Sequence, residues 1–317
     1  MKKKVLFCVM ICVAALLLVS CGAQPEENEA IRVAALRGPT AMGMLRLMED
    51  ESGAYSFELA ADASALAPAL IKGELDIAAL PANLAAVLYN NSDGAVKLAA
   101  VNTVNVLYIV ERGSSINGIA DLRGRTLYAT GEGAVPEYIL RYILNGSGLT
   151  GEAAPEIRWC SDTSEALSYI AADENAVAML PQPFVTAAKA KLGDLRVAVD
   201  LNDEFKTLSG SDIVTGVVAV RTEFAEAHPK TVARFLEEYS RSVECVLGNN
   251  AEAAALCEKY GIVGEKIALA ALPDCGITFI TGEDMRETVR NYLGILCDFE
   301  PGSVGGALPD DGFYYGE

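Results

Sequence analysis

The chain has 317 residues, 51% of them hydrophobic, which is enough to bury a large core and to form two lobes. It carries 43 Asp and Glu residues against 25 Lys and Arg residues, a formal net charge of −18. This charge argues against nucleic acid as a partner, because phosphate binding depends on cationic side chains.

Residues 1–20 have the pattern of an export signal. Lys2–Lys4 precede the apolar run Val5–Val19, which is short for a membrane span. The run ends in Leu-Val-Ser-Cys at Cys21, which resembles a bacterial lipobox. By that resemblance, cleavage precedes Cys21 and its sulfur carries a diacylglyceryl group, whose two acyl chains suffice for stable anchoring. We expect a signal peptide over 1–20, a tether over 21–30 and an anchor on the extracytoplasmic face of the cell membrane. An ordinary signal peptide or an uncleaved helix is the alternative.

From residue 31 to 110 the sequence predicts strands that alternate with helices. Apolar runs predict strands at Ile31–Leu36, Ser56–Ala60, from Ile77 onward, at Lys97–Asn102 and at Val106–Val110. A Gly-containing loop, Arg37–Thr40, leads into a helix over Ala41–Glu51. Ser64 can cap the next helix, and Gly73 ends it.

Near Glu111 we expect the chain to cross into a second lobe. Strands are predicted at Thr126–Thr130, Glu156–Cys160 and from Val177 onward, with a helix from Pro136 and another over Ser164–Ala172 capped by Thr163. The run Leu195–Leu201 leads toward the crossing back. The strand Thr215–Arg221 then returns to the first lobe.

The last hundred residues change character, because four helices follow one another with caps and breakers between them. We expect them at Pro229–Leu247, Ala251–Tyr260, Glu265–Ala271 and Glu283–Phe299, packed around the first lobe. The aromatic residues Phe313–Tyr315 should hold the tail to the body. The predicted class is therefore α/β with two lobes, one formed by 31–110 and 213–317 and the other by 111–212.

Two repeats place the candidate site. Ile77–Leu84 returns as Val177–Phe184, and each passes from four apolar residues through Leu-Pro into a helix. Val33–Met48 aligns with Tyr128–Ile143 as strand, Gly-containing loop and amphipathic helix. Four helix N-termini would then face a shared cleft, the position where small ligands bind in α/β sheets. The predicted ligand contacts are Gly38, Thr40, Met42, Asn83, Thr130, Gly131, Glu137, Gln182, Phe184 and Thr215.

No catalytic or metal-binding constellation is visible. His228 is the only histidine and lies at a helix entrance, so Ser-His-Asp chemistry has no base in a suitable setting. The cysteines after Cys21 match no zinc spacing, and we expect neither metal nor cofactor. They are odd in number, so at least one is free unless it pairs between chains; a disulfide among the last four remains open. These residues are Cys160, Cys245, Cys257, Cys275 and Cys297.

Several of these features together resemble the substrate-binding proteins of ABC importers, in the group that contains nitrate, taurine, alkanesulfonate and thiamine-pyrimidine-precursor binders. The features are the lipobox, the loop Arg37–Thr40, the segment Gly73–Ala78 and the crossings near Glu111 and Thr215. The resemblance covers about Ile31 to Phe299. It implies a two-lobed, type II-like periplasmic-binding fold with extra C-terminal helices on the first lobe, closure over a small molecule, and delivery to an ABC permease and ATPase. We expect a monomer.

The ligand class rests on charge. Glu132 and Glu137 lie in the second lobe's loop and helix, where a carboxylate would oppose a sulfonate or nitrate. We therefore hypothesise a neutral or amine-bearing, pyrimidine-like heterocycle in preference to a small sulfonate or other anion. A ligand-sensing surface lipoprotein and an exported enzyme on the same fold are the alternatives. The fold also occurs in cytoplasmic enzymes of menaquinone synthesis and in a pyrimidine synthase, and the leader argues against those roles.

Overall fold

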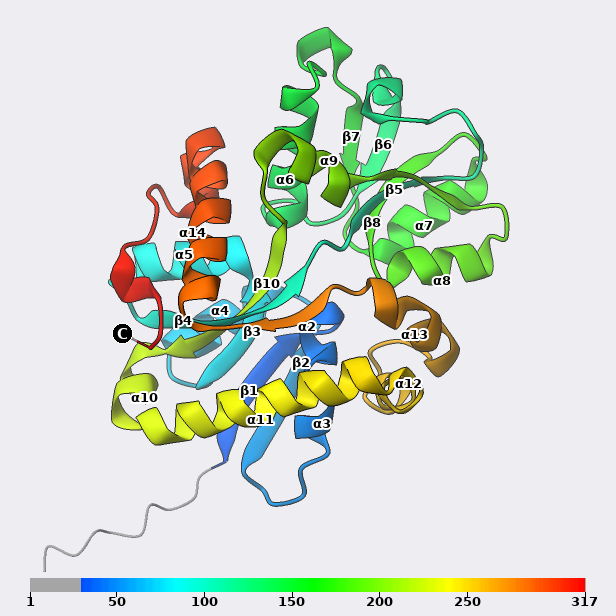
Figure 1. Ribbon diagram of the computed structural model, residues 1–317. Coiled ribbons are helices and arrows are strands. Elements are labelled where there is room, and N and C mark those ends of the chain that lie inside the picture. Colours follow the sequence, from blue (N-terminus) through cyan, green and yellow to red (C-terminus); the bar gives the residue numbers. More distant parts are fainter. Residues whose placement is uncertain (1–29, 317) are drawn as a thin grey trace, which may run out of the picture. The chain divides into compact units, whose positions relative to one another are not determined.

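Two β-sheets, each flanked by helices, make up two α/β lobes in the computed structural model, which describes residues 30–316 (Figure 1). The first-lobe sheet has the strand order β11-β4-β10-β3-β1-β2, and the second-lobe sheet has the order β7-β6-β8-β5-β9. This confirms the predicted α/β class with two lobes. The predicted signal peptide, Cys21 and all but the last residue of the tether lie outside the described residues.

The first lobe contains the N-terminal strands and the C-terminal helices. Its strands are β1 (Ile31–Leu36), β2 (Tyr55–Ala60), β3 (Ile77–Pro81), β4 (Val96–Val104), β10 (Val214–Arg221) and β11 (Ile277–Ile280). Its helices are α2 (Pro39–Met42), α3 (Leu45–Met48), α4 (Ala63–Ile71), α5 (Ala82–Asn91), α10 (Thr222–Ala227), α11 (Pro229–Gly248), α12 (Asn250–Lys259), α13 (Glu265–Ala271) and α14 (Gly282–Phe299), followed by the 3₁₀ turns η4 (Pro301–Val304) and η5 (Asp311–Phe313).

The second lobe is the middle of the chain. Its strands are β5 (Leu107–Glu111), β6 (Thr126–Ala129), β7 (Glu156–Trp159), β8 (Val177–Pro181) and β9 (Arg196–Asp200). Its helices are α6 (Val135–Gly146), α7 (Thr163–Ala172), α8 (Phe184–Lys191) and α9 (Leu201–Ser209), with the 3₁₀ turns η1 (Ile119–Leu122) and η2 (Gly151–Ala153).

Both sheets repeat one pairing scheme. In the first, β1 is parallel to β2 and β3, while β10 runs antiparallel between β3 and β4. In the second, β6 is parallel to β7 and β8, while β5 runs antiparallel between β8 and β9. Thus β3 corresponds to β8 and β1 to β6, as the sequence repeats predict. The strand that returns to the first lobe, β10, occupies the place that β5 has in the second.

The first crossing lies earlier than predicted. β5 pairs with β8 and β9, so the chain leaves the first sheet at Asn105 and Val106 rather than near Glu111. An apolar run does not reveal which of the two sheets its strand joins. The contacts of the buried Glu111 carboxylate hold β5 in the second lobe. It accepts a hydrogen bond from the backbone N–H of Ile116 at 3.0 Å and pairs with Arg196, both within the second lobe.

Two helices begin after aspartates rather than at the predicted caps. Asp62 accepts from the backbone N–H of Ser64 at 2.6 Å, and Asp162 accepts from that of Glu165 at 2.9 Å. Helix α9 and strand β11 were not predicted. α9 is largely polar, and its apolar face is narrow, with Leu201 and Phe205 buried one turn apart.

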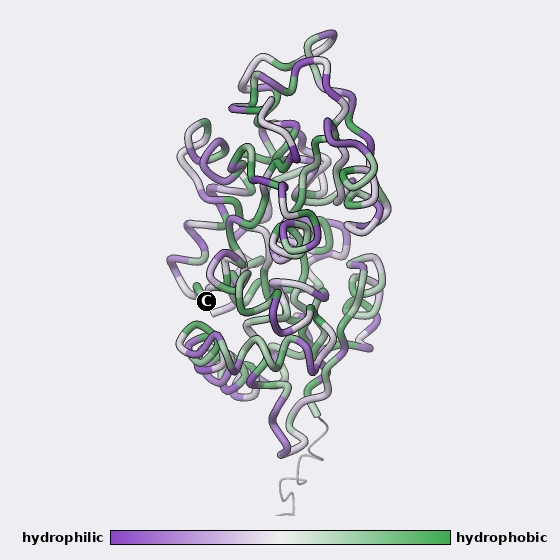
Figure 2. The backbone as a smooth tube through the Cα atoms, turned by 90° about the vertical axis from the view of Figure 1, so that its right-hand side faces the viewer, coloured by the Kyte–Doolittle hydropathy of each residue, from purple (hydrophilic) through white to green (hydrophobic). Residues whose placement is uncertain are grey.

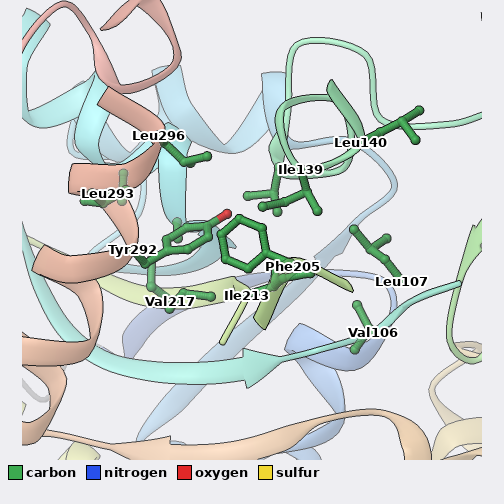
Figure 3. Packing of buried hydrophobic residues seen from close by; sticks show 14 of the residues in the cluster. Val106, Leu107, Ile139, Leu140, Phe205, Ile213, Val217, Tyr292, Leu293 and Leu296 are labelled. Atoms are coloured by element: carbon green, nitrogen blue, oxygen red, sulfur yellow. The ribbon is translucent and has the colours of Figure 1, made fainter. Parts of the chain in front are cut away.

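The apolar residues lie along the strands and the inner helix faces, while polar stretches follow the outer helices and loops (Figure 2). One buried cluster joins the two lobes through α14 of the first and α6 and α9 of the second (Figure 3). The rings of Phe205 and Tyr292 have centroids 6.0 Å apart, and those of Phe205 and Tyr142 are 5.3 Å apart. The tail is held as predicted, because the Tyr315 N–H donates to the Leu98 carbonyl at 2.9 Å.

Across residues 30–316, none of the helices combines the length and the apolar character that crossing a membrane requires. His228 is exposed, as expected for a surface residue.

Candidate ligand-binding site

The two crossings between the lobes run side by side and are joined by Asn105. Its backbone has φ 53°, a left-handed conformation that asparagine tolerates better than most residues. Its backbone N–H donates to the Ile213 carbonyl at 3.1 Å, and its Oδ1 accepts from the Ile213 N–H at 2.9 Å. Its Nδ2 donates to Asp212 Oδ1 at 3.0 Å. One residue thus fixes the spacing of the two connections that any movement of the lobes must bend.

The first-lobe wall of the candidate site is formed where β1, β4 and β10 end or begin. Thr40 Oγ1 donates to the Leu36 carbonyl at 2.9 Å, and Asn102 Nδ2 donates to the Thr40 carbonyl at 3.1 Å. Gly216 on β10 faces both, since a Cβ there would lie 2.6 Å from Thr40 Cγ2 and 2.7 Å from Asn102 Oδ1. Only glycine fits this close approach, so the wall is tightly assembled from three segments far apart in sequence.

Two further residues of this wall have polar atoms without partners. Asn83 is 3% exposed, and its Nδ2 donates to the Ser303 carbonyl at 3.3 Å. Within the described part of the chain, Asn83 Oδ1 and Thr215 Oγ1 are both buried and make no hydrogen bond. Buried polar groups are normally paired, so these two atoms require an explanation.

The other predicted residues of the first lobe have different settings. Gly38 precedes α2 with φ 150°, and a Cβ there would meet nothing within 4 Å, so conformation rather than crowding favours glycine. Met42 is fully buried and belongs to the core cluster of the first lobe.

The second-lobe wall is formed by the ends of β6 and β8, which are neighbouring parallel strands. Thr130 and Gly131 follow β6 and are half-buried, and Phe184 begins α8, also half-buried. Gln182 is 5% exposed, and its Oε1 accepts from Thr186 Oγ1 at 2.9 Å and from the Thr186 N–H at 3.3 Å. The N-terminus of α8 is therefore already capped by a side chain of its own loop.

Glu137 occupies the start of α6 in a similar way. Its Oε2 accepts from the Gly133 N–H at 2.6 Å, and its Oε1 pairs with Arg141 Nε at 2.6 Å. Glu137 as a whole residue is 8% exposed, and its carboxylate binds groups of its own helix and of the loop before it. Its negative charge is thus balanced locally by Arg141, which weakens the contribution of Glu137 to the prediction that the Glu132 and Glu137 carboxylates oppose an anion. The same carboxylate also occupies donors that an anionic ligand would need.

A cavity of about 750 Å³ lies between α6, η2 and β7 of the second lobe and the α14–η4 segment of the first. From the second lobe it is lined by Glu137, Tyr138 and Trp159, and from the first-lobe segment α14–η4 by Phe299 and Glu300. Gly302 of η4 also borders the cavity, and its neighbour Ser303 accepts from Asn83. The volume falls in the range of small-molecule sites, and Tyr138, Trp159 and Phe299 are the aromatic residues among those that line it.

The charge of the cavity is negative. The Glu137–Arg141 pair is balanced, whereas Glu300 is exposed and has no ion-pair partner among residues 30–316. Burial, followed by the nearby carboxylates of Glu137 and Glu300, raises the pKa of the Tyr138 hydroxyl above its usual value. Tyr138 therefore stays neutral and can donate a hydrogen bond at physiological pH.

Of the predicted contacts, Glu137 alone is among the residues that line this cavity. Tyr138, Trp159, Phe299 and Glu300 were not predicted. Trp159 carried a usable signal, because it is the only tryptophan and ends a strand beside β6. Phe299 and Glu300 had none, since a helix end gives no indication of what it faces.

No group of residues in the described chain has the composition of a metal site. The five cysteines from Cys160 onward are all free thiols. Cys257 and Cys275 are fully buried, and burial raises the pKa of the Cys257 thiol to about 11. These are packing residues rather than metal ligands or nucleophiles.

Comparisons with solved structures support the architecture. The chain resembles an ABC transporter protein of Parabacteroides distasonis, with 26% identity, a TM-score of 0.76, and coverage of 91% of this chain and 99% of that one. It also resembles the periplasmic aliphatic sulphonate binding protein SsuA of Escherichia coli, with 15% identity, a TM-score of 0.72, and coverage of 89% and 95%. It also resembles the alkanesulfonate-binding protein SsuA of Xanthomonas axonopodis pv. citri bound to MOPS, with 14% identity, a TM-score of 0.69, and coverage of 91% of this chain and 96% of that one.

These similarities confirm the predicted type II-like periplasmic-binding fold with two α/β lobes. No curated protein sequence matches the chain. The sequence profile of a family described as "ABC transporter, phosphonate, periplasmic substrate-binding protein" matches residues 44–270. This family and the solved neighbours are binding components and not enzymes, which confirms that prediction as well. The chain belongs to the phosphonate family of periplasmic substrate-binding proteins of ABC transporters.

Proposed function

We propose that this protein is a lipid-anchored solute receptor that captures an amine-bearing or neutral heterocycle between its lobes and delivers it to an ABC permease and ATPase. Its role as the solute-binding component of an importer follows from the family. The anchor is inferred from the lipobox-like sequence at Cys21. The ligand class is inferred from the cavity that both lobes border.

The observation that carries the ligand class is the combination of aromatic rings with an unbalanced carboxylate. Tyr138, Trp159 and Phe299 offer ring faces and edges for stacking. Glu300 adds a negative charge, which attracts an amine or a protonated ring nitrogen and repels a sulfonate or phosphonate. An aromatic face beside a carboxylate is a favourable setting for a cationic or polarised ring.

The energies are consistent with useful affinity. Micromolar binding requires about 8 kcal/mol net. Hydrogen bonds to the ligand contribute about 0.5–1.5 kcal/mol each. Ring stacking adds about 0.5–1.5 kcal/mol for each aromatic contact beyond the burial of apolar area. Several contacts of each kind are therefore needed, and the ligand must touch both lobes.

The single tryptophan makes the test direct. We would titrate cytosine, uracil, ethanesulfonate and methylphosphonate into the mature protein and follow Trp159 fluorescence together with thermal stability. A probe at 100 times its dissociation constant should stabilise the protein by about 2.7 kcal/mol. We expect cytosine or uracil to change both signals and the two anions to change neither. Stabilisation by an anion without stabilisation by a heterocycle would refute the ligand class.

Two matched variants assign the effect to the cavity. Tyr138→Ala removes a ring from its lining, and we expect it to weaken heterocycle binding about tenfold. Tyr169→Ala removes a ring that is 40% exposed on α7, where it stacks on Tyr128. Equal weakening by both variants would show that the cavity is not where the ring binds.

The anchor needs a separate experiment. In a bacterial host that processes lipoproteins, the wild-type chain should incorporate labelled fatty acid and partition with membranes. Cys21→Ala should abolish the label and release the protein from the membrane. Labelling that survives this substitution would refute lipidation at Cys21.

A further inference from the structure

Two charged side chains line the cavity from different lobes. Arg141 belongs to α6 of the second lobe, and Glu300 directly follows α14 of the first. The ring of Tyr142, the neighbour of Arg141, packs edge-on against the ring of Phe299, the neighbour of Glu300, with the centroids 5.5 Å apart. This aromatic contact between α6 and α14 brings the guanidinium and the carboxylate to the same cavity.

The charge of Arg141 is already balanced, but most of its hydrogen-bond donors are free. Glu137 Oε1 pairs with Arg141 Nε at 2.6 Å, while Glu137 Oε2 accepts from the Gly133 N–H at 2.6 Å and so fixes the carboxylate to the loop before α6. Among residues 30–316, Glu137 is the only ion-pair partner of Arg141, whose side chain is 56% exposed. A guanidinium has five N–H donors in a rigid fork, so most of them are left for a ligand. A neutral acceptor can use these donors, whereas an anion gains little because the pair has no net charge.

Glu300 has the opposite character. It is exposed and has no ion-pair partner in the described part of the chain. It is also the C-cap of α14, a helix of 18 residues, whose carbonyl end adds a partial negative charge. A carboxylate forms stronger hydrogen bonds with N–H groups than a neutral acceptor does. This end of the cavity therefore favours an amine.

We propose that Arg141 and Glu300 determine which heterocycle the cavity accepts: the guanidinium donates to a carbonyl oxygen and a ring nitrogen, and the carboxylate accepts from an exocyclic amine. Glu137 is a positioning residue, because it orients the guanidinium and cancels its charge. A pyrimidine with a 2-oxo and a 4-amino group, such as cytosine, presents both patterns. The inference rests on the proposed function, since it specifies how the same cavity selects its ligand.

Related rings test the two interactions separately. Dimethylcytosine, with both methyl groups on the exocyclic amine, keeps the acceptors of cytosine and lacks its amine N–H groups. 4-Aminopyrimidine keeps the amine and lacks the carbonyl. We would measure the dissociation constants of the three rings for the mature protein by calorimetry. We expect cytosine to bind about tenfold more tightly than either analogue, a difference of one to two hydrogen bonds.

Conservative variants assign each interaction to its residue. Arg141→Lys keeps the charge beside Glu137 and loses the planar fork. It should weaken cytosine binding about three- to tenfold and leave 4-aminopyrimidine binding within about twofold. Glu300→Gln should weaken cytosine binding by a similar factor and leave dimethylcytosine binding within about twofold. Asp298→Asn is the matched control, because it removes a carboxylate from α14 at a residue that is not among those lining the cavity. It should leave all three affinities within about twofold.

A double variant tests the charge balance without a heterocycle. The charged residues that line the cavity are Glu137, Arg141 and Glu300, so Glu137→Gln/Glu300→Gln leaves only the guanidinium charged. The amide introduced at position 137 can still accept from the Gly133 N–H. We expect methylphosphonate at about 10 mM to raise the Tm of this variant by about 2 °C or more and to leave the wild-type Tm unchanged.

The outcomes distinguish the two proposals. Equal binding of the three rings by the wild-type protein, or equal weakening of all three by Arg141→Lys and Glu300→Gln, would overturn this assignment and leave the ligand class standing. So would a double variant that methylphosphonate does not stabilise, because Arg141 would then be closed to ligands. Wild-type protein that binds methylphosphonate in place of the rings, or binds none of these compounds, would overturn both proposals. If Arg141→Lys does not fold, the wild-type affinities and Glu300→Gln still decide.

Discussion

Asn105 Nδ2 donates to Asp212 Oδ1 at 3.0 Å and so ties the outgoing crossing between the lobes to the returning one. The Asp212 carboxylate also accepts from Lys206 Nζ at 3.0 Å. The Asn105 hydrogen bond, together with Lys206, lowers the pKa of Asp212 below its usual value despite partial burial. The two connections are therefore held by the Asn105 amide and by an Asp212 carboxylate that remains charged at neutral pH.

Asn105→Ala removes both side-chain hydrogen bonds and leaves a non-glycine residue without local support at φ 53°. We expect a loss of about 2–3 kcal/mol in the free energy of urea-induced unfolding. Asn105→Gly relaxes the backbone and should lose about 1 kcal/mol less than the alanine variant. In both variants the Ile213 amide should exchange faster with deuterium, because its acceptor is gone. Unchanged protection of Ile213 would contradict this account of the crossings.

Asp76 gives a prediction with a defined pH window. Its buried carboxylate accepts from Arg32 Nη2 at 2.6 Å and from Arg221 Nη2 at 3.4 Å, which links β1 and β10 to the residue before β3. Burial by itself raises the pKa of Asp76, but the hydrogen bonds from Arg32 outweigh it, so that the pKa lies below the usual 3.8. The stabilisation is present above the unfolded-state value and is lost as pH falls through the lower folded-state value.

We therefore expect Asp76→Asn to lower the free energy of unfolding by about 3 kcal/mol at pH 7, since the buried carboxylate that links the Arg32 and Arg221 guanidinium groups is lost. The difference from wild type should stay constant from pH 8 to about 5 and shrink below about pH 4. Glu223→Gln is the control, because Glu223 pairs with Arg221 while 88% exposed, and its effect should stay below about 0.5 kcal/mol. If the difference in the free energy of unfolding between Asp76→Asn and wild type grew as the pH fell, this account of Asp76 would be contradicted.

The repeated Leu-Pro segments could be predicted because each signal is local. In both, the proline ends a strand that pairs with an antiparallel neighbour: Pro81 lies opposite Gly216, and Pro181 lies opposite Leu107. Asp76, in the segment Gly73–Ala78 that contributed to the family resemblance, also lies in a local sequence pattern. The side chains that pair with it, however, are distant in sequence. Its two arginine partners are 44 and 145 residues away.

The site itself was only partly predictable, because its walls join residues that the sequence separates. Asn83 was predicted from the helix start, but the atom that orients it belongs to Ser303, 220 residues later. Trp159 and Phe299 line one cavity from different lobes, and no periodicity relates them. Glu137 was predicted to face the ligand, and it lines the cavity, but its two carboxylate oxygens also contact Gly133 and Arg141, which the helix start alone does not reveal. Short-range patterns locate strand ends, whereas partners depend on the packing of the lobes.

Gly276 precedes β11 and lies against Val104, the last residue of β4 before the crossing. Substitution of this glycine tests how closely the two segments must pack. The φ of Gly276 is 57°, and a Cβ there would lie 1.6 Å from the Val104 carbonyl oxygen, a backbone atom that cannot rotate away. We expect Gly276→Ala to cost more than about 3 kcal/mol or to prevent folding. Gly282→Ala has a similar φ of 62° with nothing within 4 Å, so it should cost only about 1–2 kcal/mol. Urea unfolding compares the two, and equal costs would mean that conformation rather than the clash is limiting.

Phe205 tests the apolar contact between the lobes. Its ring is fully buried beside that of Tyr292 of α14, with the centroids 6.0 Å apart (Figure 3). The ring of Tyr142 of α6 lies at a centroid distance of 5.3 Å. Phe205→Ala removes the ring that both tyrosines contact and leaves a cavity, so the free energy of unfolding should fall by about 3–5 kcal/mol.

Leu208 on the same helix is 39% exposed and supplies the matched control, because Leu208→Ala removes a side chain with much less buried surface and should cost about 1 kcal/mol or less. The shape of the unfolding curve carries the second half of the prediction. Since the cluster spans both lobes, they should unfold in one transition in the wild-type protein. Phe205→Ala should lower the cooperativity or separate two transitions, whereas Leu208→Ala should not. A single transition of unchanged steepness in Phe205→Ala would mean that other contacts couple the lobes.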